Sequence, residues 1–383
     1  MKILMMTRGL PFHGIGGMEV VAWDLAKKIA QYGHEITIIT TPANGLEDKT
    51  ILNGVQIRII NSSPNKYSKK WIEDSKKLYL EEYIDHVDIV LSVSAAAKHL
   101  VTLKKERRPK FVLQAHGTSW GEFLSKMRQQ KILSLIKSLK NIIGYFADIP
   151  YRQFDKVIAI GEPVYQDYTN FPSNLLISNN LKIIKNGIDY EVFKYNEENR
   201  QEIRKKYNIS DKECVIVSCS RLHEQKGVVE ALNAFEAVYK INDNLRYFII
   251  GSGPEYGNLK ALISQKNLTK VVYLLGNLDR LEIAKIYSGC DIFLFLSKRN
   301  EGLPINVLEA CSTGLPVFLT KFSHHSDFNS VVLDDLSPNL VADTLINWVN
   351  KNKLGLHRGN YLPVKYSLDY SAKKYISEFE ELL

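Results

Sequence analysis

Two successive series of apolar runs that alternate with amphipathic segments constrain the fold of this chain most strongly. In the first half, six short apolar runs have the length and composition of buried strands. They lie at Ile3–Thr7, Glu35–Thr40, Val55–Ile60, Asp88–Val93, Phe111–Ala115 and Lys156–Ile160. Met18–Tyr32 has the period of an amphipathic helix and is followed by Gly33, a typical helix stop. Strands and helices that alternate in this way predict an α/β protein with a doubly wound parallel sheet.

A second series of the same kind occupies the other half of the chain. Its apolar runs lie at Cys214–Cys219, Leu245–Ile250, Val271–Leu275, Asp291–Leu296 and Pro316–Thr320. With 383 residues the chain is too long for one hydrophobic core, and the turn-like Asn186–Asp189 precedes an acidic polar stretch. We therefore predict two Rossmann-like domains, residues 1–185 and 186–366, that face an interdomain cleft.

The net charge of +8 is concentrated in residues 98–140, which hold 11 basic residues against Glu106 and Glu122. The basic residues are Lys98, Lys104, Lys105, Arg107, Arg108, Lys110, Lys126, Arg128, Lys131, Lys137 and Lys140. Apolar side chains in 122–146 follow the helical period, with lysines at polar positions. This pattern fits either a sheet-covering helix with a solvated basic face or a helix on an anionic membrane surface. Aromatic residues are sparse there, so we expect no nucleic-acid partner.

Other features of the sequence indicate where the protein works. No apolar run approaches the length of a membrane span, and Met1–Arg8 is charged too early for a signal peptide. The four cysteines have no metal or redox spacing and lie in apolar surroundings: Cys214, Cys219, Cys290 and Cys311. We therefore expect a cytoplasmic protein in a reducing compartment, peripheral at the inner face of the membrane if residues 98–140 bind anionic lipid.

Two glutamates flank the start of a short predicted helix that follows the fourth apolar run of the second half. Glu301 lies in the loop before Pro304, which suits the first helical position, and Glu309 lies four residues after Ile305. The free N–H groups of Ile305 and Asn306 would form an anion site at the positive end of the helix dipole. Because carboxylates accept hydrogen bonds from vicinal hydroxyls, the spacing suits a sugar phosphate. The alternative is a surface loop followed by an ordinary amphipathic helix.

Two loops at the ends of predicted strands in the first half carry candidate binding residues. Gly14–Gly17 lacks the third glycine of a dinucleotide fingerprint, so hydride chemistry is not supported. Gly16 and Gly17 would still let the backbone approach a diphosphate or a sugar, and a plain tight turn is the alternative. His116 follows an apolar strand, at the edge where doubly wound sheets bind ligands. A purely structural histidine is the alternative there.

Cations follow the first predicted strand of the second half. Arg221 and Lys226 are placed to reach a diphosphate, although ordinary surface charges show the same spacing. Gly253 and Asn277, after the next two strands, would shape the floor beneath a nucleoside base. The Asp-x-Asp signature of metal–diphosphate binding does not occur in the sequence. We therefore expect no metal and no cofactor, and protein cations would offset the charge of a leaving diphosphate.

In this order the motifs resemble glycosyltransferase family 4 of the retaining GT-B glycosyltransferases. The resemblance runs along nearly the whole chain. It rests on Gly16-Gly17, Ala115–Gly117, Asn186–Asp189, Arg221 with Lys226-Gly227, Gly251–Pro254, Glu301–Pro304 through Glu309-Ala310, and Gly314–Val317. Two segments depart from the family pattern. Leu303-Pro304 replaces the common Phe-Gly, and residues 321–329 replace a Gly-Gly and an acidic stretch, which puts that loop's part in the donor pocket in doubt.

The resemblance implies roles for individual residues. Arg221 and Lys226 would bind the donor diphosphate, while Glu309 would hold the ribose hydroxyls. Glu301 would hold the sugar hydroxyls, and His116 would lie near the reacting side of the sugar. The predicted catalytic residues are His116, Glu301, Arg221 and Lys226. The predicted donor-binding residues are Gly16, Gly17, Gly253, Asn277, Leu303, Pro304, Ile305, Asn306 and Glu309. The final helix, 367–383, would cross back onto the first domain.

The resemblance implies a retaining, metal-independent transfer of a hexose-type sugar from a nucleotide sugar to a hydroxyl. A UDP-sugar is favoured as donor, with GDP-mannose as the alternative. The N-terminal domain would bind the acceptor, a lipid-linked saccharide or a surface polysaccharide, and the C-terminal domain would bind the donor. Competing interpretations are a GT-B nucleotide-sugar epimerase, a phosphorylase, or a non-catalytic subunit of a glycosyltransferase complex. The presence of both glutamates, Glu301 and Glu309, together with the cations Arg221 and Lys226, argues against the last of these.

Overall fold

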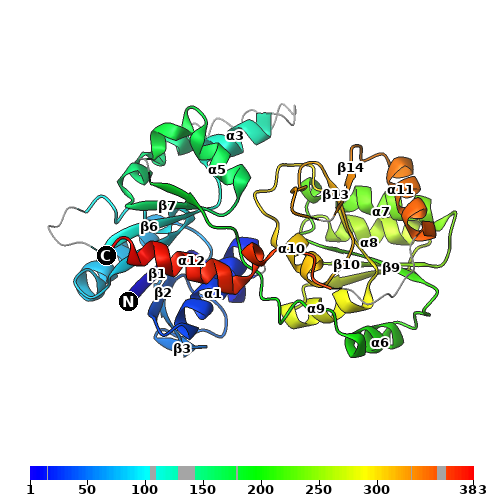
Figure 1. The fold of residues 1–383 in the computed structure, drawn as a ribbon, viewed down its shortest axis with the longest axis horizontal. Coiled ribbons are helices and arrows are strands. Elements are labelled where there is room, and N and C mark those ends of the chain that lie inside the picture. Colours follow the sequence, from blue (N-terminus) through cyan, green and yellow to red (C-terminus); the bar gives the residue numbers. More distant parts are fainter. Residues whose placement is uncertain (15, 104–108, 128–142, 178–179, 329, 352–358) are drawn as a thin grey trace. The chain divides into compact units, whose positions relative to one another are not determined.

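The computed structural model describes residues 1–14, 16–103, 109–127, 143–177, 180–328, 330–351 and 359–383 of the chain. The chain forms two compact units, which Figure 1 shows as two sets of helices around two sheets. The N-terminal unit comprises Met1–Gly187 with Lys365–Leu383, and the C-terminal unit comprises Ile188–Val364. The sequence placed the two junctions after residues 185 and 366, where the structure has them after 187 and 364.

The N-terminal unit is built on an eight-stranded sheet with the order β3-β4-β2-β1-β5-β6-β7-β8 among the described residues. Neighbouring strands are parallel, apart from the antiparallel pair of β3 and β4. The strands are β1 (Lys2–Met6), β2 (Glu35–Thr40), β3 (Thr50–Leu52), β4 (Val55–Ile59), β5 (Ile89–Val93), β6 (Lys110–Ala115), β7 (Lys156–Ala159) and β8 (Leu181–Ile183). The central strands read as apolar runs because both faces of the sheet are covered.

Helices cover the sheet of the N-terminal unit. They are α1 (Gly17–Gln31), α2 (Lys69–Leu78) with the π-helical turn η2 (Tyr79–Tyr83), α3 (Ser119–Met127), α5 (Glu162–Thr169) and α12 (Leu368–Glu380). Short 3-10 helices lie at Pro11–His13, Ser94–Ala97, Ile149–Gln153, Ser173–Leu176 and Val364–Tyr366. Two hydrophobic clusters form because alternate residues of a strand point to opposite faces: Leu4 and Met6 join one, and Ile3 and Met5 join the other.

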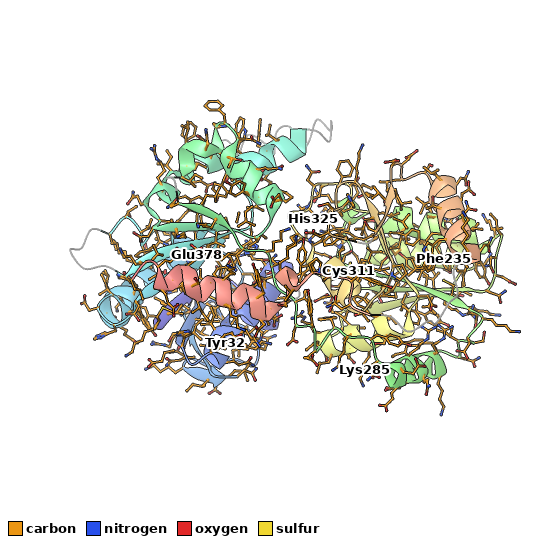
Figure 2. The ribbon with its side chains drawn as sticks, in the orientation of Figure 1. Tyr32, Phe235, Lys285, Cys311, His325 and Glu378 are labelled. Carbon is orange, nitrogen blue, oxygen red and sulfur yellow. The ribbon has the colours of Figure 1, made fainter. Side chains whose placement is uncertain are left out.

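The C-terminal unit has a six-stranded parallel sheet with the order β11-β10-β9-β12-β13-β14 among the described residues. Its strands are β9 (Cys214–Cys219), β10 (Leu245–Ile250), β11 (Val272–Gly276), β12 (Ile292–Phe295), β13 (Val317–Thr320) and β14 (Ser330–Leu333). Its helices are α6 (Glu197–Lys206), the 3-10 helix Glu224–Lys226, α7 (Val228–Tyr239), α8 (Tyr256–Gln265), α9 (Arg280–Gly289), α10 (Ile305–Ser312) and α11 (Pro338–Lys351). Phe235 of α7, labelled in Figure 2, belongs to the buried cluster between α7 and the sheet.

The predicted α/β fold with two doubly wound parallel sheets is confirmed. All the predicted strands are present, with ends that differ by at most one residue. The sequence missed β3, β8 and β14, which are the short strands at or beside the sheet edges.

The C-terminal helix α12 belongs to the N-terminal unit, where it lies beside α1 (Figure 1, red beside blue). Gly187 makes this close packing feasible, because a Cβ there would lie 2.5 Å from the Cα of Leu368. Ser371 donates a hydrogen bond to the carbonyl of Lys185 at 2.7 Å. Glu378, labelled in Figure 2, pairs with Lys156 of β7 at 2.5 Å. The helix is therefore attached at both its ends.

The basic region 98–140 is described only in part. Lys104, Lys105, Arg107, Arg108, Arg128, Lys131, Lys137 and Lys140 lie outside the described residues, as does most of the predicted helix 122–146. Lys98 donates a hydrogen bond to the carbonyl of Ala147 at 3.1 Å and pairs with Asp148 at 3.8 Å, so its charge is partly neutralised within the unit. Within the described ranges, no helix combines the length and apolar character of a bilayer-spanning segment.

Candidate functional site

In the C-terminal unit, two loops meet where the neighbouring parallel strands β9 and β12 end. The first loop leads from β9 to Lys226, and the second leads from β12 through Ser297 to Glu301. The backbone N–H of Lys298 donates to the carbonyl of Gln225 at 2.8 Å and so joins the two loops. Ligands of doubly wound sheets bind at this edge, so the residues of these two loops form the candidate site.

Gly227 allows the first loop to lie against the end of β12. Its φ of +65° is in the left-handed region, and a Cβ at this position would lie 1.9 Å from the carbonyl oxygen of Leu296. Any larger residue would clash with this backbone atom, which cannot move without disturbing the strand end. The glycine therefore holds the preceding residue, Lys226, beside the loop that carries Glu301.

Three side chains converge on the same oxygen of Glu301, two of them as hydrogen-bond donors and the third, Arg299, as an ion pair. Lys226 Nζ lies 2.7 Å from Oε1, and Ser297 Oγ lies 2.6 Å from it. Arg299 Nε approaches the same atom at 3.5 Å. The described residues supply no hydrogen bond to Oε2, so this oxygen can accept one from a ligand hydroxyl. The sequence predicted Lys226 and Glu301 as separate members of the site, and the structure brings them into one ion pair.

Burial and mutual charge determine the ionisation of this pair. Burial acts to raise the pKa of Glu301, but the charges of Lys226 and Arg299 outweigh it and lower the pKa below its ordinary value. Burial lowers the pKa of Lys226, and the carboxylate of Glu301 opposes this shift. The Glu301 side chain is only 8% exposed, so the carboxylate is a fixed acceptor in a protected position.

Glu309 is a buried carboxylate inside α10, among Val307, Leu308 and Ala310. Arg280, the first residue of α9, donates to its Oε1 from Nη2 at 2.9 Å and from Nε at 3.2 Å. The Arg280 guanidinium also lies over the ring of Phe193, 4.9 Å from its centroid. The predicted ribose-binding acid is thus held by Arg280, whose guanidinium in turn packs on an aromatic ring of the same unit.

The start of α10 differs from the prediction in one respect. Pro304 was predicted at the first helical position, but it is the N-cap, with an extended ψ of 116°, and the helix begins at Ile305. The cause is local: the carbonyl of Pro304 accepts from Val307 and Leu308, as an N-cap carbonyl does. The backbone N–H groups of Ile305 and Asn306 remain first-turn donors. The Asn306 side chain donates to the carbonyl of Cys219 at 2.6 Å and ties α10 to the end of β9.

The other predicted residues of the C-terminal unit lie in the loops that follow β9, β10, β11 and β12. Arg221 and Asn277 are exposed, and Leu303 is 6% exposed. Arg221 forms no ion pair with the described residues, so its guanidinium is available to an anion. Gly253 follows β10, where a Cβ would lie 2.3 Å from the carbonyl oxygen of Leu222. Glycine is therefore required there by the neighbouring backbone, whatever else binds nearby.

The N-terminal unit holds the remaining predicted residues. Gly16 is the N-cap of α1 and Gly17 is its first residue; a Cβ on Gly16 would lie 2.0 Å from Oε2 of Glu19. His116 follows β6, and its Nε2 lies 3.1 Å from Oε1 of Gln114. Burial, followed by the charge of Arg8, lowers the pKa of His116 to about 4. The histidine is therefore neutral at pH 7.

Comparison with known families agrees with this arrangement. The family model for "Glycosyltransferase Family 4" matches residues 15–192, and the model for "Glycosyl transferases group 1" matches residues 199–334. The two matches divide the chain between them in the way the two units do.

The chain belongs to glycosyltransferase family 4.

This glycosyltransferase is a GT-B enzyme that depends on a nucleotide sugar. It is 24% identical over 386 residues to N-acetyl-alpha-D-glucosaminyl L-malate synthase of Bacillus anthracis. The aligned region covers 97% of this chain and 94% of that relative. The chain is 26% identical over 324 residues to alpha-monoglucosyldiacylglycerol synthase of Acholeplasma laidlawii, with 80% and 77% covered. The structure of Anabaena HepE in complex with UDP and glucose shares the fold, with a TM-score of 0.76 over 100% of both chains at 17% identity.

Sequence reasoning missed Arg280 and Gln114, which contact predicted site residues of the glycosyltransferase, and Tyr375, which contacts Gln114. Arg280 had an indirect signal, because a glutamate among the apolar residues of α10 requires a cation partner. The sequence also contains a signal for Gln114, which is a polar residue inside the apolar run before His116. Tyr375 had none, since only the packing of α12 on the N-terminal sheet brings it to Gln114.

Proposed function

We propose that this glycosyltransferase transfers a hexose from a UDP-sugar to a hydroxyl acceptor, with retention at the anomeric carbon and without a metal ion. The observation that carries the proposal is the convergence of Lys226, Ser297 and Arg299 on one oxygen of the buried Glu301. The sequence has no Asp-x-Asp motif, so protein cations must offset the diphosphate charge. The fold shared with HepE, which was crystallised with UDP and glucose, favours UDP over GDP.

The proposed chemistry breaks the bond between the anomeric carbon and the diphosphate oxygen and forms one to the acceptor oxygen on the same face. Negative charge grows on the leaving diphosphate, and Lys226, Arg221 and the first N–H groups of α10 offset it. A phosphate oxygen takes the acceptor proton. Glu301 accepts a hydrogen bond from a sugar hydroxyl, and Glu309 accepts from the ribose hydroxyls. His116 lies at the reacting side of the sugar in this proposal.

Replacement of Lys226 tests the cation role. We expect Lys226→Ala to lower turnover about 10²–10³-fold, the usual effect of removing one preorganised donor from a transition state. The measurement is the release of UDP at saturating donor. Lys285→Ala is the matched control, because Lys285 is a more exposed lysine of the same unit that also pairs with a glutamate, Glu202 at 3.9 Å. Equal turnover in the Lys226 variant and the control would contradict the assignment.

The donor base is tested by thermal shift with UDP, GDP and ADP, followed by the corresponding sugars. A nucleotide present at 100 times its dissociation constant stabilises the folded protein by about 2.7 kcal/mol, which is readily measured. We expect UDP to give the largest shift and Glu309→Gln to reduce it. Conversion of the bound donor to an isomer without acceptor, or to a sugar phosphate with free phosphate, would instead show an epimerase or a phosphorylase.

We further propose that the acceptor is a lipid-linked saccharide or a surface polysaccharide at an anionic membrane. The support is the excess of basic residues in 98–140 and the exposed apolar side chains that follow it. Ile143, Phe146 and Ile149 are 72%, 63% and 50% exposed. Exposed apolar side chains next to a basic stretch are typical of proteins that bind membrane surfaces. A lipid glycoside synthase among the relatives is consistent with such an acceptor.

Binding to vesicles tests the membrane proposal. We expect the protein to sediment with vesicles of anionic lipid, and expect this binding to decrease as salt rises. Ile143→Ser should weaken binding, while Ile241→Ser should leave it unchanged, because Ile241 is 68% exposed but lies in the C-terminal unit. Binding that is insensitive to salt, or equally weakened by both substitutions, would reject the proposal.

A further inference from the structure

A line of three hydrogen-bonded side chains joins the C-terminal helix to His116 inside the N-terminal unit. Gln114, on β6, donates from Nε2 to the hydroxyl of Tyr375 on α12 at 3.0 Å. Its other amide atom, Oε1, lies 3.1 Å from Nε2 of His116. The two ends of this line are 259 residues apart in the sequence, so the packing of α12 on the sheet creates it.

Burial fixes the middle member of the line, Gln114, and the outer member on α12, Tyr375. Gln114 is 1% exposed and Tyr375 is 2% exposed. Tyr375 packs in the same cluster as Trp23 of α1 and Ile3 of β1, which leaves its ring no room to turn away. Both polar groups of the buried Gln114 amide form hydrogen bonds, the nitrogen to Tyr375 and the oxygen to His116, as buried polar groups generally do.

The orientation of the Gln114 amide determines where the proton of His116 lies. Because the amide nitrogen donates to Tyr375, the amide oxygen faces His116 and can only accept. The Nε2 atom of His116 must therefore carry the proton, and Nδ1 keeps its lone pair. Among the described residues, Nδ1 has no hydrogen-bond partner. The imidazole thus presents an acceptor to any hydroxyl that approaches it.

We propose that Gln114 and Tyr375 are positioning residues that hold His116 as the Nε2-protonated neutral tautomer, so that Nδ1 accepts a hydrogen bond from a hydroxyl of the bound sugar. This inference rests on the proposed function of His116 and adds to it the atom that meets the ligand. Burial and the charge of Arg8, which follows β1, favour the neutral ring. The C-terminal helix therefore takes part in catalysis without touching substrate.

The tautomer can be read directly by NMR on protein with ¹⁵N-labelled histidine side chains, with His116→Ala used to assign the resonances. We expect wild-type His116 at pH 7 as the Nε2–H tautomer. Tyr375→Phe leaves the Gln114 amide nitrogen without its acceptor and should lower the ratio of Nε2–H to Nδ1–H about twofold to tenfold, the range for one uncharged hydrogen bond. Tyr366→Phe is the matched control, because Tyr366 is also buried and its hydroxyl accepts from Lys185 at 3.1 Å instead.

Gln114→Glu gives a second, opposite signature. A carboxylate still accepts from Nε2, so the tautomer should persist, while its charge should raise the pKa of His116 by about 1–3 units. An NMR titration would show this rise, and the pH profile of kcat/KM should move with it. Gln114→Met, which has no acceptor, should instead lose the tautomer preference. If Gln114→Glu keeps the tautomer preference of His116 and Gln114→Met loses it, the hydrogen bond from Gln114 positions the proton. If both variants keep it, the Gln114 side chain only fills space.

Two outcomes would overturn the inference: an Nδ1–H tautomer in the wild type, or the same tautomer ratio in Tyr375→Phe as in wild type. The proposed function of His116 is tested by a different measurement, the rate of sugar transfer by His116→Ala. A rate equal to that of the wild type would contradict that function. The NMR result decides the hydrogen-bond line whether or not His116 proves essential. If both hold, we expect Tyr375→Phe to lower kcat/KM about threefold to tenfold and the control Tyr366→Phe to keep the wild-type value.

Discussion

At the scale of single residues, the buried carboxylates of the candidate site take their partners from distant parts of the chain. Glu301 pairs with Lys226, 75 residues away, and Glu309 pairs with Arg280, 29 residues away. The spacing of the two glutamates is local, so the sequence could predict both of them. The cation that each one meets depends on how α9, β9 and β12 pack, and no local pattern contains that information.

His99 shows how a buried histidine makes stability depend on pH. Its Nε2 lies 2.9 Å from Oγ of Ser75, whose own proton is donated to the carbonyl of Trp71. Nε2 of His99 is therefore the donor of this bond. Burial, followed by the charges of Lys76 and Lys98, lowers the pKa of His99 to about 4. The folded protein thus resists a proton that the unfolded chain binds near pH 6.5.

We expect the free energy of unfolding to fall as the pH decreases from about 6.5 to about 4. In this window the unfolded state binds more protons than the folded state, so acid favours unfolding, and the loss due to His99 should be on the order of 2 kcal/mol at pH 4.5. Urea unfolding at pH 7, 5.5 and 4.5 measures it. His99→Gln keeps an N–H donor for Ser75 and should make the profile less steep, while His116, whose pKa is also lowered to about 4, keeps its own contribution. His86→Gln, at an exposed position, should leave the profile as in wild type; a flatter curve there would contradict the assignment.

At the scale of elements, the longer apolar runs were predicted and the short strands at the sheet margins were not. β3 has three residues and β8 has three, and their mixed burial gives no apolar run. A turn signal for β3 was nevertheless present. Asn53-Gly54 connects β3 to β4, and both residues have positive φ, as a two-residue hairpin turn requires. The β3–β4 hairpin could therefore have been predicted, whereas β8 could not.

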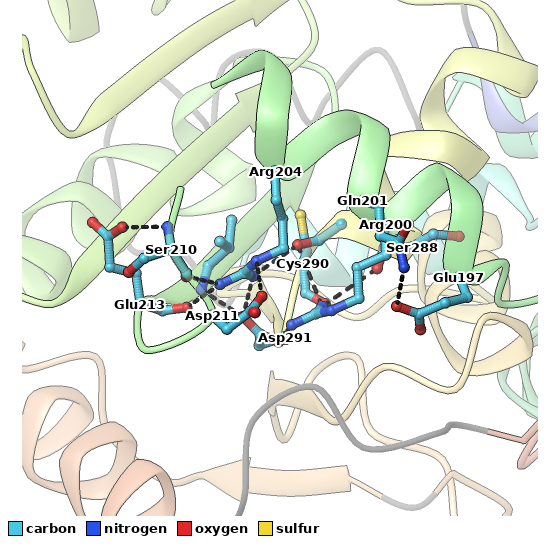
Figure 3. A network of polar contacts seen from close by, with 12 residues as sticks. Glu197, Arg200, Gln201, Arg204, Ser210, Asp211, Glu213, Ser288, Cys290 and Asp291 are labelled. Carbon is cyan, nitrogen blue, oxygen red and sulfur yellow. Dashed lines mark hydrogen bonds and ion pairs between the residues drawn. The ribbon is translucent and has the colours of Figure 1, made fainter. Parts of the chain in front are cut away.

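Helix α6 is attached to the sheet by a buried charge network, which Figure 3 shows. Arg200 and Arg204 donate to the two oxygens of Asp291 at 2.9 and 3.2 Å, and Asp291 also accepts from the N–H of Val215 at 2.8 Å. Arg200 also reaches the last carbonyls of α9, where a cation is favoured by the helix dipole. The network lies at the amino ends of β9 and β12, the opposite edge from Glu301.

Asp291→Asn tests the network. The substitution leaves two buried guanidinium groups without their anion, so we expect a loss of about 3–5 kcal/mol in the free energy of unfolding. Donor binding at a temperature where the variant is folded should remain as in wild type, because the network lies away from the site. Asp211→Asn is the control: Asp211 approaches Arg204 at 3.8 Å but is fully exposed, so we expect unchanged stability. If both variants lost a similar free energy of unfolding, the burial of Asp291 would not explain the effect of its substitution.

At the scale of the whole molecule, the sequence predicted two doubly wound units because each has its own complete series of strands and helices. The return of the chain to the N-terminal unit was implied by the family resemblance and not by any periodicity. The contacts that hold α12 could not be predicted, because they join its residues to segments more than 180 residues earlier. Ala372, Tyr375 and Phe379 are the residues of α12 that enter the core of that unit.

Removal of residues 365–383 tests whether α12 is part of the N-terminal core. Loss of Tyr375 and Phe379 alone removes about 3–6 kcal/mol of apolar burial, a large part of the stability of a typical domain. We expect hydrogen exchange, followed by mass spectrometry, to accelerate in β1, β5 and β6 and to stay slow in β9 and β10. UDP should still protect the loop that carries Glu301, since the residues of that cluster lie within 188–364. A chain that lacks only residues 381–383 serves as control, and slow exchange in both units of the longer deletion would show that α12 is dispensable for the N-terminal fold.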